Sequence, residues 1–344
     1  MLPSSGASRR RALAGLAGAS TLLLAGRSPA QGNGPGVAHA QGLTTLPAPP
    51  KRVAVLDLAA LDILQALGIA PVGVPKVNFP PYLAAYGDDA FPKIGTLFEP
   101  DDEALRAAQP DLIINAGRSA NKYAALSRIA PTIDLSSSTQ GFVASVARNI
   151  LLLGRLFDRQ AQAAARAEQL LANARALQDK GARAGKGLLL FAVGNGLAPQ
   201  APQTRFGIVY EVAGITPLMA AADQPPARAR ARQPQAPAEG TPEAAAAEAA
   251  RARQSQEQAE RLARLLARDP DWLFVLDRPS ATGGEPIAPD LLAANAAIAQ
   301  TTAWKKQQVI HLDAPGWYLV GGGPTMLENS MASIRAAFDG KPAA

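Results

Sequence analysis

The chain has 344 residues, 48% of them hydrophobic and none of them cysteine, which excludes disulfides, thiolate metal sites, cysteine nucleophiles and a lipid anchor on an N-terminal cysteine. Lysine and arginine number 34 against 28 aspartate and glutamate, but much of the excess arginine lies at the N-terminus and in residues 228–268. This uneven charge and an aromatic content of only 5% argue against a nucleic-acid partner. The length allows two domains with additional segments.

The first 40 residues resemble a twin-arginine export signal. Consecutive arginines, Arg9 to Arg11, precede a mildly apolar run from Ala14 to Gly26 that is too short to span a bilayer as a permanent helix. Small-x-small cleavage motifs end at Ala30 and at Ala40, and we favour cleavage after Ala40. No later stretch is apolar enough to cross a membrane, so we expect the mature protein to be soluble in the periplasm.

Residues 41–138 alternate short apolar strands with helices, which predicts an α/β lobe with a parallel sheet. The strand at 112–115 is apolar almost throughout, as expected of a strand buried on both faces. The predicted strands are 52–57, 72–74, 112–115 and 132–134, and the predicted helices are 58–67, 101–108 and 121–129.

Residues 139–181 predict one uninterrupted linking helix. Apolar residues recur in steps of three or four from Phe142 to Leu177, Thr139 is suited to cap the first turn, and Gly181 supplies a stop. About 40 residues at about 1.5 Å each give a rod of about 60 Å, longer than one small domain needs. The alternative is a coiled-coil arm, but the apolar steps drift from a strict heptad. We therefore interpret this segment as a rigid helix that joins two bodies.

From residue 182 to 344 the alternation of strands and helices restarts and predicts a second α/β lobe. Residues 223–250 form a low-complexity insertion whose composition does not support a packed core, although its alanine-rich end fits a helix from Ala244 to Leu266. The predicted strands are 188–193, 272–276 and 309–312, and the predicted helices are 206–213 and 325–338.

Three arginines follow predicted strands, at the edge where open parallel sheets bind ligands. Arg118 follows the strand 112–115, Arg205 lies in the loop after 188–193, and Arg278 follows 272–276. Any one of them alone is better explained as a surface or ion-paired arginine. Three in equivalent positions on two lobes indicate a site for a delocalised anionic ligand, which the planar guanidinium fork suits.

A glycine-rich stretch, Trp317 to Pro324, allows close backbone approach to a ligand or a tight turn into the helix that begins near Pro324. It lacks the lysine and Ser/Thr of a phosphate-binding loop, and the tight turn explains it at least as well. Within it, Tyr318 can either face the cleft with its phenol or pack against neighbours.

Catalysis finds little support in the sequence. The mature chain would keep one histidine, His311, inside an apolar strand where we expect a core role. No nucleophile elbow, zinc-type histidine spacing or phosphate loop is present in the sequence. We assign no catalytic residue and expect the protein not to be an enzyme.

Several motifs together resemble the periplasmic binding proteins of ABC importers for ferric siderophores, specifically the catecholate branch that includes petrobactin and enterobactin receptors. The resemblance covers roughly Arg52 to Phe338 apart from the insertion. The motifs are Lys93 to Pro100, Gln109 to Ile114, Thr204 to Gly207, Asp269 to Arg278, Thr302 to Lys305 and Trp317 to Leu319.

The resemblance implies a class III periplasmic binding protein: two Rossmann-like α/β lobes joined by a single long rigid helix, with the ligand between them. It implies that Arg118, Arg205 and Arg278 contact the anionic catecholates. Tyr318 would bind iron directly where the siderophore leaves coordination sites open. The expected ligand is an Fe(III)-siderophore, the expected partner is an ABC permease in the inner membrane, and no other cofactor and no oligomer are expected.

The sequence departs from the family pattern in two places. Related proteins often carry a second iron-binding histidine in the loop that here spans 220–235, where this chain has none. This departure favours a saturated tris-catecholate, or another anionic chelate, as the ligand. Glu103 matches the first permease-docking glutamate, but the second position is Ala263, with Glu260 one turn away as the candidate substitute.

Two alternatives remain. One is a haem or corrinoid receptor with the same fold. The other, from a different functional class, is a secreted enzyme acting on an anionic metabolite, which needs a nucleophile or base near Arg118 and Arg205 that the sequence does not supply.

Overall fold

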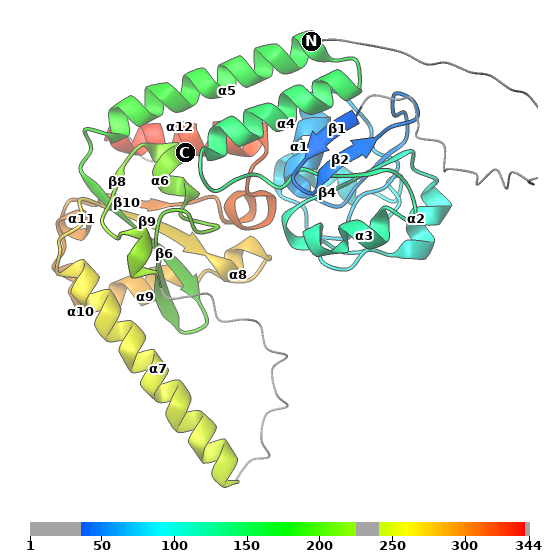
Figure 1. Ribbon diagram of the computed structural model, residues 1–344. Coiled ribbons are helices and arrows are strands. Elements are labelled where there is room, and N and C mark those ends of the chain that lie inside the picture. Colours follow the sequence, from blue (N-terminus) through cyan, green and yellow to red (C-terminus); the bar gives the residue numbers. More distant parts are fainter. Residues whose placement is uncertain (1–35, 225–240, 341–344) are drawn as a thin grey trace, which may run out of the picture.

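The computed structural model describes residues 36–224 and 241–340. It has two α/β lobes that lie side by side, with the long helices α4 (Phe142–Leu156) and α5 (Gln160–Gly181) running along one side of both (Figure 1). Within the described residues, no helix combines the length and the apolar character that a membrane span requires.

The first lobe contains a three-stranded parallel sheet in the order β3-β4-β5, as predicted. Every residue of these three strands is buried, including the polar Asn115, Thr132 and Asp134, and burial explains the apolar runs of β3 and β4. The predicted strand at 72–74 forms only isolated bridges. The strands of this lobe are β1 (Gly36–His39), β2 (Gly42–Thr45), β3 (Val53–Val55), β4 (Leu112–Asn115) and β5 (Thr132–Asp134). Its helices are α1 (Leu58–Ala66), η1 (Pro81–Gly87), α2 (Asp102–Ala108), η2 (Gly117–Lys122) and α3 (Tyr123–Leu126).

An antiparallel hairpin of β1 and β2 precedes the first lobe's sheet and belongs to its body. Val37 is buried in the core, and the amide of Ala40 donates to the carbonyl of Asp134 at 3.0 Å. Cleavage after Ala40 would cut this hairpin at its turn and remove β1. The predicted boundary at residue 40 therefore lies at the turn of this hairpin, and the choice between the two cleavage sites stays a prediction. Residues 1–35, with the rest of the predicted signal, lie outside the described residues.

The predicted single helix over 139–181 is wrong: the segment forms two helices that pack against each other as a hairpin. Between them Asp158 adopts a left-handed conformation with φ 54°, and the amide of Arg159 reaches back to the carbonyl of Gly154 at 2.7 Å. This is a Schellman-type helix end with aspartate where glycine is usual. A Cβ on Gly154 would lie 2.2 Å from that of Ala163, so the two helices meet almost backbone to backbone.

The second helix of this pair, α5, keeps the linking role that the sequence predicted. At one end Gln162 donates to the carbonyl of Ala66 in the first lobe at 2.8 Å. At the other end Gln178 donates to the carbonyl of Glu211 in the second lobe at 2.9 Å. With 22 residues α5 is about 33 Å long, about half the predicted rod.

The second lobe is built on a mixed sheet in the order β10-β9-β6-β7, with the short β8 beside β6 and only β7 antiparallel. His311 lies in the edge strand β10 and is exposed, so the predicted core role is wrong for this side chain. The strands are β6 (Lys186–Val193), β7 (Gly196–Gln200), β8 (Thr216–Pro217), β9 (Trp272–Asp277) and β10 (Val309–His311). The helices are α6 (Ile208–Ala213), η3 (Ala221–Asp223), α7 (Pro242–Leu266), α8 (Arg278–Ala281), α9 (Ala288–Ala293), α10 (Ala296–Ala299), α11 (Thr302–Lys305), the π-helical segment η4 (Gly316–Val320) and α12 (Pro324–Phe338).

The insertion predicted at 223–250 is folded at both of its ends. Asp223 closes η3, accepts from the amide of Ala220 at 2.9 Å and lies 3.8 Å from the guanidinium of Arg268. From Pro242 the chain is helical, which confirms the predicted helix, and α7 projects away from the second lobe (Figure 1). Residues 225–240 lie outside the described part of the chain.

Candidate ligand-binding site

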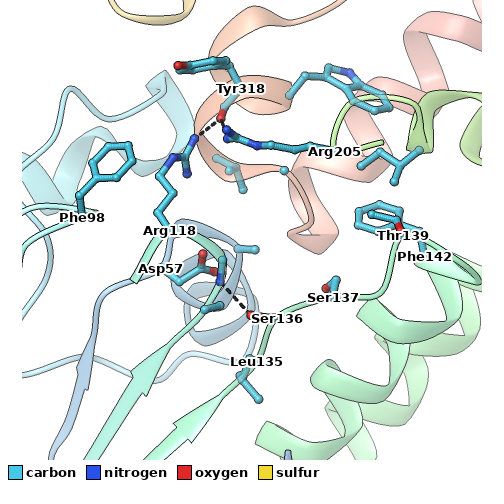
Figure 2. A pocket seen from close by; sticks show the side chains of 17 residues that line it. Asp57, Phe98, Arg118, Leu135, Ser136, Ser137, Thr139, Phe142, Arg205 and Tyr318 are labelled. Atoms are coloured by element: carbon cyan, nitrogen blue, oxygen red, sulfur yellow. Dashed lines mark hydrogen bonds between the residues drawn. The ribbon is translucent and has the colours of Figure 1, made fainter. Parts of the chain in front are cut away.

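A cavity of about 550 Å³ lies between the two lobes. The first lobe contributes Arg118 to its wall, the second lobe contributes Arg205, and the η4 segment contributes Tyr318 (Figure 2). The structure thus brings three of the four predicted ligand-binding residues into one cavity.

Arg118 comes from η2, directly after β4, and is half-buried. Its guanidinium crosses to η4 and donates to the backbone carbonyl of Leu319 at 3.0 Å and to that of Tyr318. It also lies 5.7 Å from the ring centre of Phe98, which is exposed for 46% of its surface. Burial lowers the pKa of Arg118, and the charge of Asp57 opposes this shift. An arginine so placed stays charged, because its ordinary pKa is far above neutral.

Asp57 caps α1 at the carboxyl end of β3, and its carboxylate accepts from the amide of Ala60 at 2.9 Å. Desolvation raises the pKa of Asp57, while that hydrogen bond and the charge of Arg118 lower it. The carboxylate supplies local negative charge beneath the Arg118 side chain (Figure 2).

Arg205 reaches the same cavity from the second lobe, in the loop before α6. It donates to the backbone carbonyl of Tyr318 at 2.6 Å, so this one carbonyl accepts from an arginine of each lobe. The guanidinium carbon lies 4.9 Å from the ring centre of Phe206 and 5.1 Å from that of Tyr318. Two arginines on one carbonyl form a cationic centre that an anionic ligand can share.

Arg278 occupies a different place from the other two arginines. It begins α8 at the carboxyl end of β9, is exposed, and does not line the cavity. Its Nε lies 3.4 Å from the hydroxyl of Tyr318, which is the contact that joins it to the site. Arg278 therefore acts on the phenol from outside the cavity.

Tyr318 both packs and faces the cleft, the two possibilities that the sequence left open. Its half-buried ring stacks on Phe191 at 6.1 Å and on Phe206 at 5.8 Å between ring centres. Burial tends to raise the pKa of Tyr318, but the Arg278 hydrogen bond and the charges of Arg278, Arg205 and Arg118 together lower it below the ordinary value. The three arginines therefore make the Tyr318 phenol more acidic than an ordinary tyrosine side chain.

The glycine-rich stretch after Tyr318 forms the tight turn that the sequence predicted, although a π-helical segment and not a strand precedes it. Gly321 has φ 70°, and its amide closes η4 by donating to the carbonyl of Gly316 at 2.8 Å. Pro324 then begins α12. Such π-helical turns are rare and often lie at functional sites.

Sequence reasoning missed the aromatic side chains of the site: Phe98 lines the cavity, and Phe191 and Phe206 stack on Tyr318 without lining it. Phe191 lies within a strand and Phe206 just before α6, so each looked like ordinary core in the sequence. Phe98 carried a usable signal, because it stands in one of the motifs that support the family resemblance.

The two predicted docking glutamates lie on the surface of different lobes. Glu103 is exposed in the first turn of α2. Glu260 is exposed on α7, where it accepts from Gln256 at 3.1 Å and lies 3.9 Å from Arg264. Both are accessible, and their role in docking stays a prediction. Elsewhere in the described residues, no three His, Asp or Glu side chains gather in an arrangement suited to a metal ion.

Residues 53–315 match the model of a periplasmic binding protein family, so the chain belongs to this family. It is 30% identical over 302 residues to the petrobactin-binding protein YclQ of Bacillus subtilis (strain 168), covering 86% of this chain and 84% of the relative. It is 27% identical over 298 residues to the ferric-anguibactin-binding protein FatB of Vibrio anguillarum, covering 85% and 84%.

The fold agrees with this assignment. The periplasmic catecholate-siderophore binding protein VctP of Vibrio cholerae superposes with a TM-score of 0.71 at 28% identity, over 88% of this chain and 99% of that chain. The structure is therefore that of a class III periplasmic binding protein, as the sequence motifs implied.

Proposed function

We propose that this protein is the periplasmic receptor of an ABC importer and that it captures a ferric siderophore of the catecholate type. The observation that carries the proposal is the backbone carbonyl of Tyr318, on which Arg118 and Arg205 converge from opposite lobes. Support comes from the relatives, whose names state binding of petrobactin and of ferric anguibactin, and from VctP, described as binding catecholate siderophores.

The charge and shape of the cavity suit such a ligand. A ferric tris-catecholate carries about three negative charges, and its oxygens can replace the Tyr318 carbonyl as acceptors for guanidinium groups in a partly dry cleft. Its aromatic rings can stack on Phe98, which lines the cavity and already lies against Arg118. The volume of about 550 Å³ is in the range of small-molecule sites.

Tyr318 adds a second mode of recognition. The arginines favour its phenolate, so it can supply one oxygen to a siderophore complex whose iron has open positions. The chain has two histidines in all, His39 and His311, and neither stands in the loop 220–235 where related receptors often provide one. Iron therefore arrives with most or all of its ligands supplied by the siderophore.

Delivery requires a membrane partner. We propose that Glu103 and Glu260 present one negative charge from each lobe to positive groups of the permease, and that the protein docks as a monomer after export by its N-terminal signal. The receptor binds and releases the chelate without chemical change, in keeping with a family of substrate-binding transport proteins.

The direct test is a titration of the purified protein with Fe(III)-enterobactin, followed by tryptophan fluorescence. Trp317 lines the cavity, so a bound coloured complex should quench it. The proposal predicts saturable 1:1 quenching at submicromolar concentration and weaker binding of Fe(III)-citrate. Absence of binding by any ferric catecholate, with normal binding of haem or a corrinoid, would move the protein to the alternative receptor class.

A further inference from the structure

A buried carboxylate crosses from the first lobe to the helix that follows the ligand-binding segment. Asp62, on α1, has no exposed surface. Its Oδ2 accepts from the amide of Met326 at 3.1 Å, and its Oδ1 lies 3.4 Å from the amide of Thr325. These amides belong to the first turn of α12, so Asp62 caps a helix more than 260 positions away in sequence.

The sequence around the start of α12 is fitted to this distant cap. The local N-cap residue is Gly323, which has no side chain to satisfy the first amides of the helix. A Cβ on Gly323 would lie 1.9 Å from the Asp62 carboxylate, so glycine is needed there for the carboxylate to enter. The negative charge also lies at the positive end of the helix dipole.

The capped helix is joined directly to the ligand-binding segment. Three glycines, residues 321–323, separate η4 from α12. Arg118 holds the carbonyls of η4, and Asp62 holds the first amides of α12. Both side chains come from the first lobe, so this lobe clamps the segment on both sides of its glycine joint.

We propose that Asp62 is a positioning residue of the cleft: by capping α12 from the first lobe, it fixes the glycine joint and keeps Tyr318 placed between Arg118 and Arg205. The effect on ligand affinity rests on the proposed function. Asp62 itself touches no ligand, because it does not line the cavity.

Charged and titratable groups surround Asp62 on several elements. Arg166 of α5 faces it and pairs with Glu328 of α12 at 2.9 Å. The phenols of Tyr82 and Tyr86 approach it from η1, and Asp313 lies on the same side near Tyr82. The Tyr82 hydroxyl is buried and has no hydrogen-bond partner among the described residues.

Protonation should loosen this clamp without unfolding the protein. Burial raises the pKa of Asp62 to about 6, against the hydrogen bonds from Thr325 and Met326 and the charge of Arg166. Because the folded-state pKa lies above the ordinary value of 3.8, proton uptake between pH 7 and pH 5 favours the folded protein. The neutral carboxyl, however, accepts more weakly from α12 and no longer places a negative charge at its first turn, so ligand affinity should fall while stability does not.

The test compares Asp62→Asn with a matched control, Asp101→Asn. Asp101 caps α2 within the first lobe, accepting from the amides of Glu103 and Ala104 at 3.0 Å, and has no link to α12. With Fe(III)-enterobactin at pH 7.5, we expect Asp62→Asn to bind about tenfold more weakly than wild type and Asp101→Asn to bind equally well. Titration of the siderophore affects both proteins equally, so the ratio of their affinities reports Asp62 alone. This ratio of wild-type to Asp62→Asn affinity should approach one as the pH falls through about 6, because wild-type Asp62 then becomes neutral.

Amide hydrogen exchange of the ligand-free proteins gives a second readout. Asp62→Asn should speed exchange in residues 316–331, and Asp101→Asn should not. If Asp62→Asn folds poorly, Gly323→Ala, which drives a methyl group into the carboxylate, should reproduce both effects. Unchanged exchange in residues 316–331, or an affinity ratio of one at pH 7.5, would overturn the inference. Failure of wild type to bind any ferric catecholate would instead reject the proposed function, and the exchange result would still decide the role of Asp62.

Discussion

Arg118 and Arg278 occupy the same kind of position on the two lobes, yet the structure gives them different surroundings. Each follows the carboxyl end of a central strand. Arg118 is half-buried, spans the lobes and donates to two backbone carbonyls. Arg278 is exposed and reaches the hydroxyl of Tyr318 at 3.4 Å. Topology thus places both arginines at the edge of the cleft. Their burial and contacts decide how much each contributes to the free energies of ligand binding and of folding.

Arg205 stands between these two cases. It is exposed like Arg278, but it lines the cavity and shares the Tyr318 carbonyl with Arg118. If the comparison is right, the three arginines differ in two separable quantities, ligand affinity and the stability of the ligand-free protein. Substitutions should rank them in the order Arg118, Arg205, Arg278.

The largest effect should come from Arg118→Ala. The change removes two charge-assisted hydrogen bonds and leaves the Asp57 carboxylate without its compensating charge, so affinity for Fe(III)-enterobactin should fall about a hundredfold or more. The free energy of unfolding should also fall by about 1–3 kcal/mol, because carbonyl groups of η4 lose their donors. Calorimetry of binding and urea unfolding measure the two effects. Arg118→Lys, which keeps the charge but not the planar guanidinium, should recover part of the affinity. Unchanged stability in Arg118→Ala would contradict the conclusion that Arg118 holds η4 in place.

Arg205→Ala should weaken ferric-catecholate binding by roughly tenfold to a hundredfold. Thermal stability of the ligand-free protein should stay nearly unchanged, because this side chain is exposed. Fluorescence titration and thermal melts give both values. Arg128→Ala, at an exposed arginine of the first lobe, is the control for loss of one positive charge. A large drop in melting temperature without a change in affinity would show that Arg205 stabilises the fold and does not bind the ligand.

Tyr318→Phe separates direct iron binding from packing. The ring stacking on Phe191 and Phe206 is retained, so stability should change little. If the phenolate binds iron, the charge-transfer absorption of a bound tetradentate ferric catecholate should shift. Binding of hexadentate Fe(III)-enterobactin should hardly change. Identical spectra of wild type and variant with the tetradentate ligand would exclude iron binding by Tyr318.

Among the three arginines, Arg278→Ala should have the smallest effect on affinity, a severalfold loss that high salt largely removes. Its clearer signature is the titration of Tyr318. Arg278 lowers the pKa of that phenol by its hydrogen bond and its charge, so the variant should form phenolate at higher pH than wild type. Ultraviolet difference absorbance from pH 8 to pH 12 measures the shift, with Tyr318→Phe identifying the signal. A phenolate that forms at the same pH in wild type and variant would show that the Arg278 contact is not made in solution.

The sequence predicted the sheets and the sheet-edge arginines because both follow from local patterns. Buried strands such as β4 are continuous apolar runs, and ligands bind where such parallel strands end. Once the strand 112–115 was recognised, Arg118 was placed at the cleft without any knowledge of tertiary contacts.

The break in the predicted helix 139–181 was invisible for a physical reason. Both α4 and α5 present apolar residues to the same core, so the helical period continues across the junction. The turn depends on Asp158 in a left-handed conformation, which glycine usually marks in a sequence. The hairpin of β1 and β2 was missed because its strands have four residues each and little apolar alternation.

The role of Asp62 was beyond sequence reasoning altogether. In the sequence it is one of two polar residues, with Gln65, in a mainly apolar helix, and the amides that it caps lie more than 260 positions later. The sequence pattern around its partner glycine, Gly323, indicated a tight turn or a close backbone approach to a ligand. Contacts of this kind depend on how the lobes pack, which local patterns do not encode.

The most direct test of the account is a binding titration of the triple variant Arg118→Ala, Arg205→Ala, Arg278→Ala with Fe(III)-enterobactin, after circular dichroism has shown that it is folded. The control is Arg128→Ala, Arg155→Ala, Arg175→Ala, which removes the same charge from exposed helical and loop positions away from the cleft. We predict that the control binds like wild type and that the cleft variant shows no saturable binding at micromolar concentration. Equally tight binding by the cleft variant and wild type would contradict recognition of an anionic chelate by these arginines.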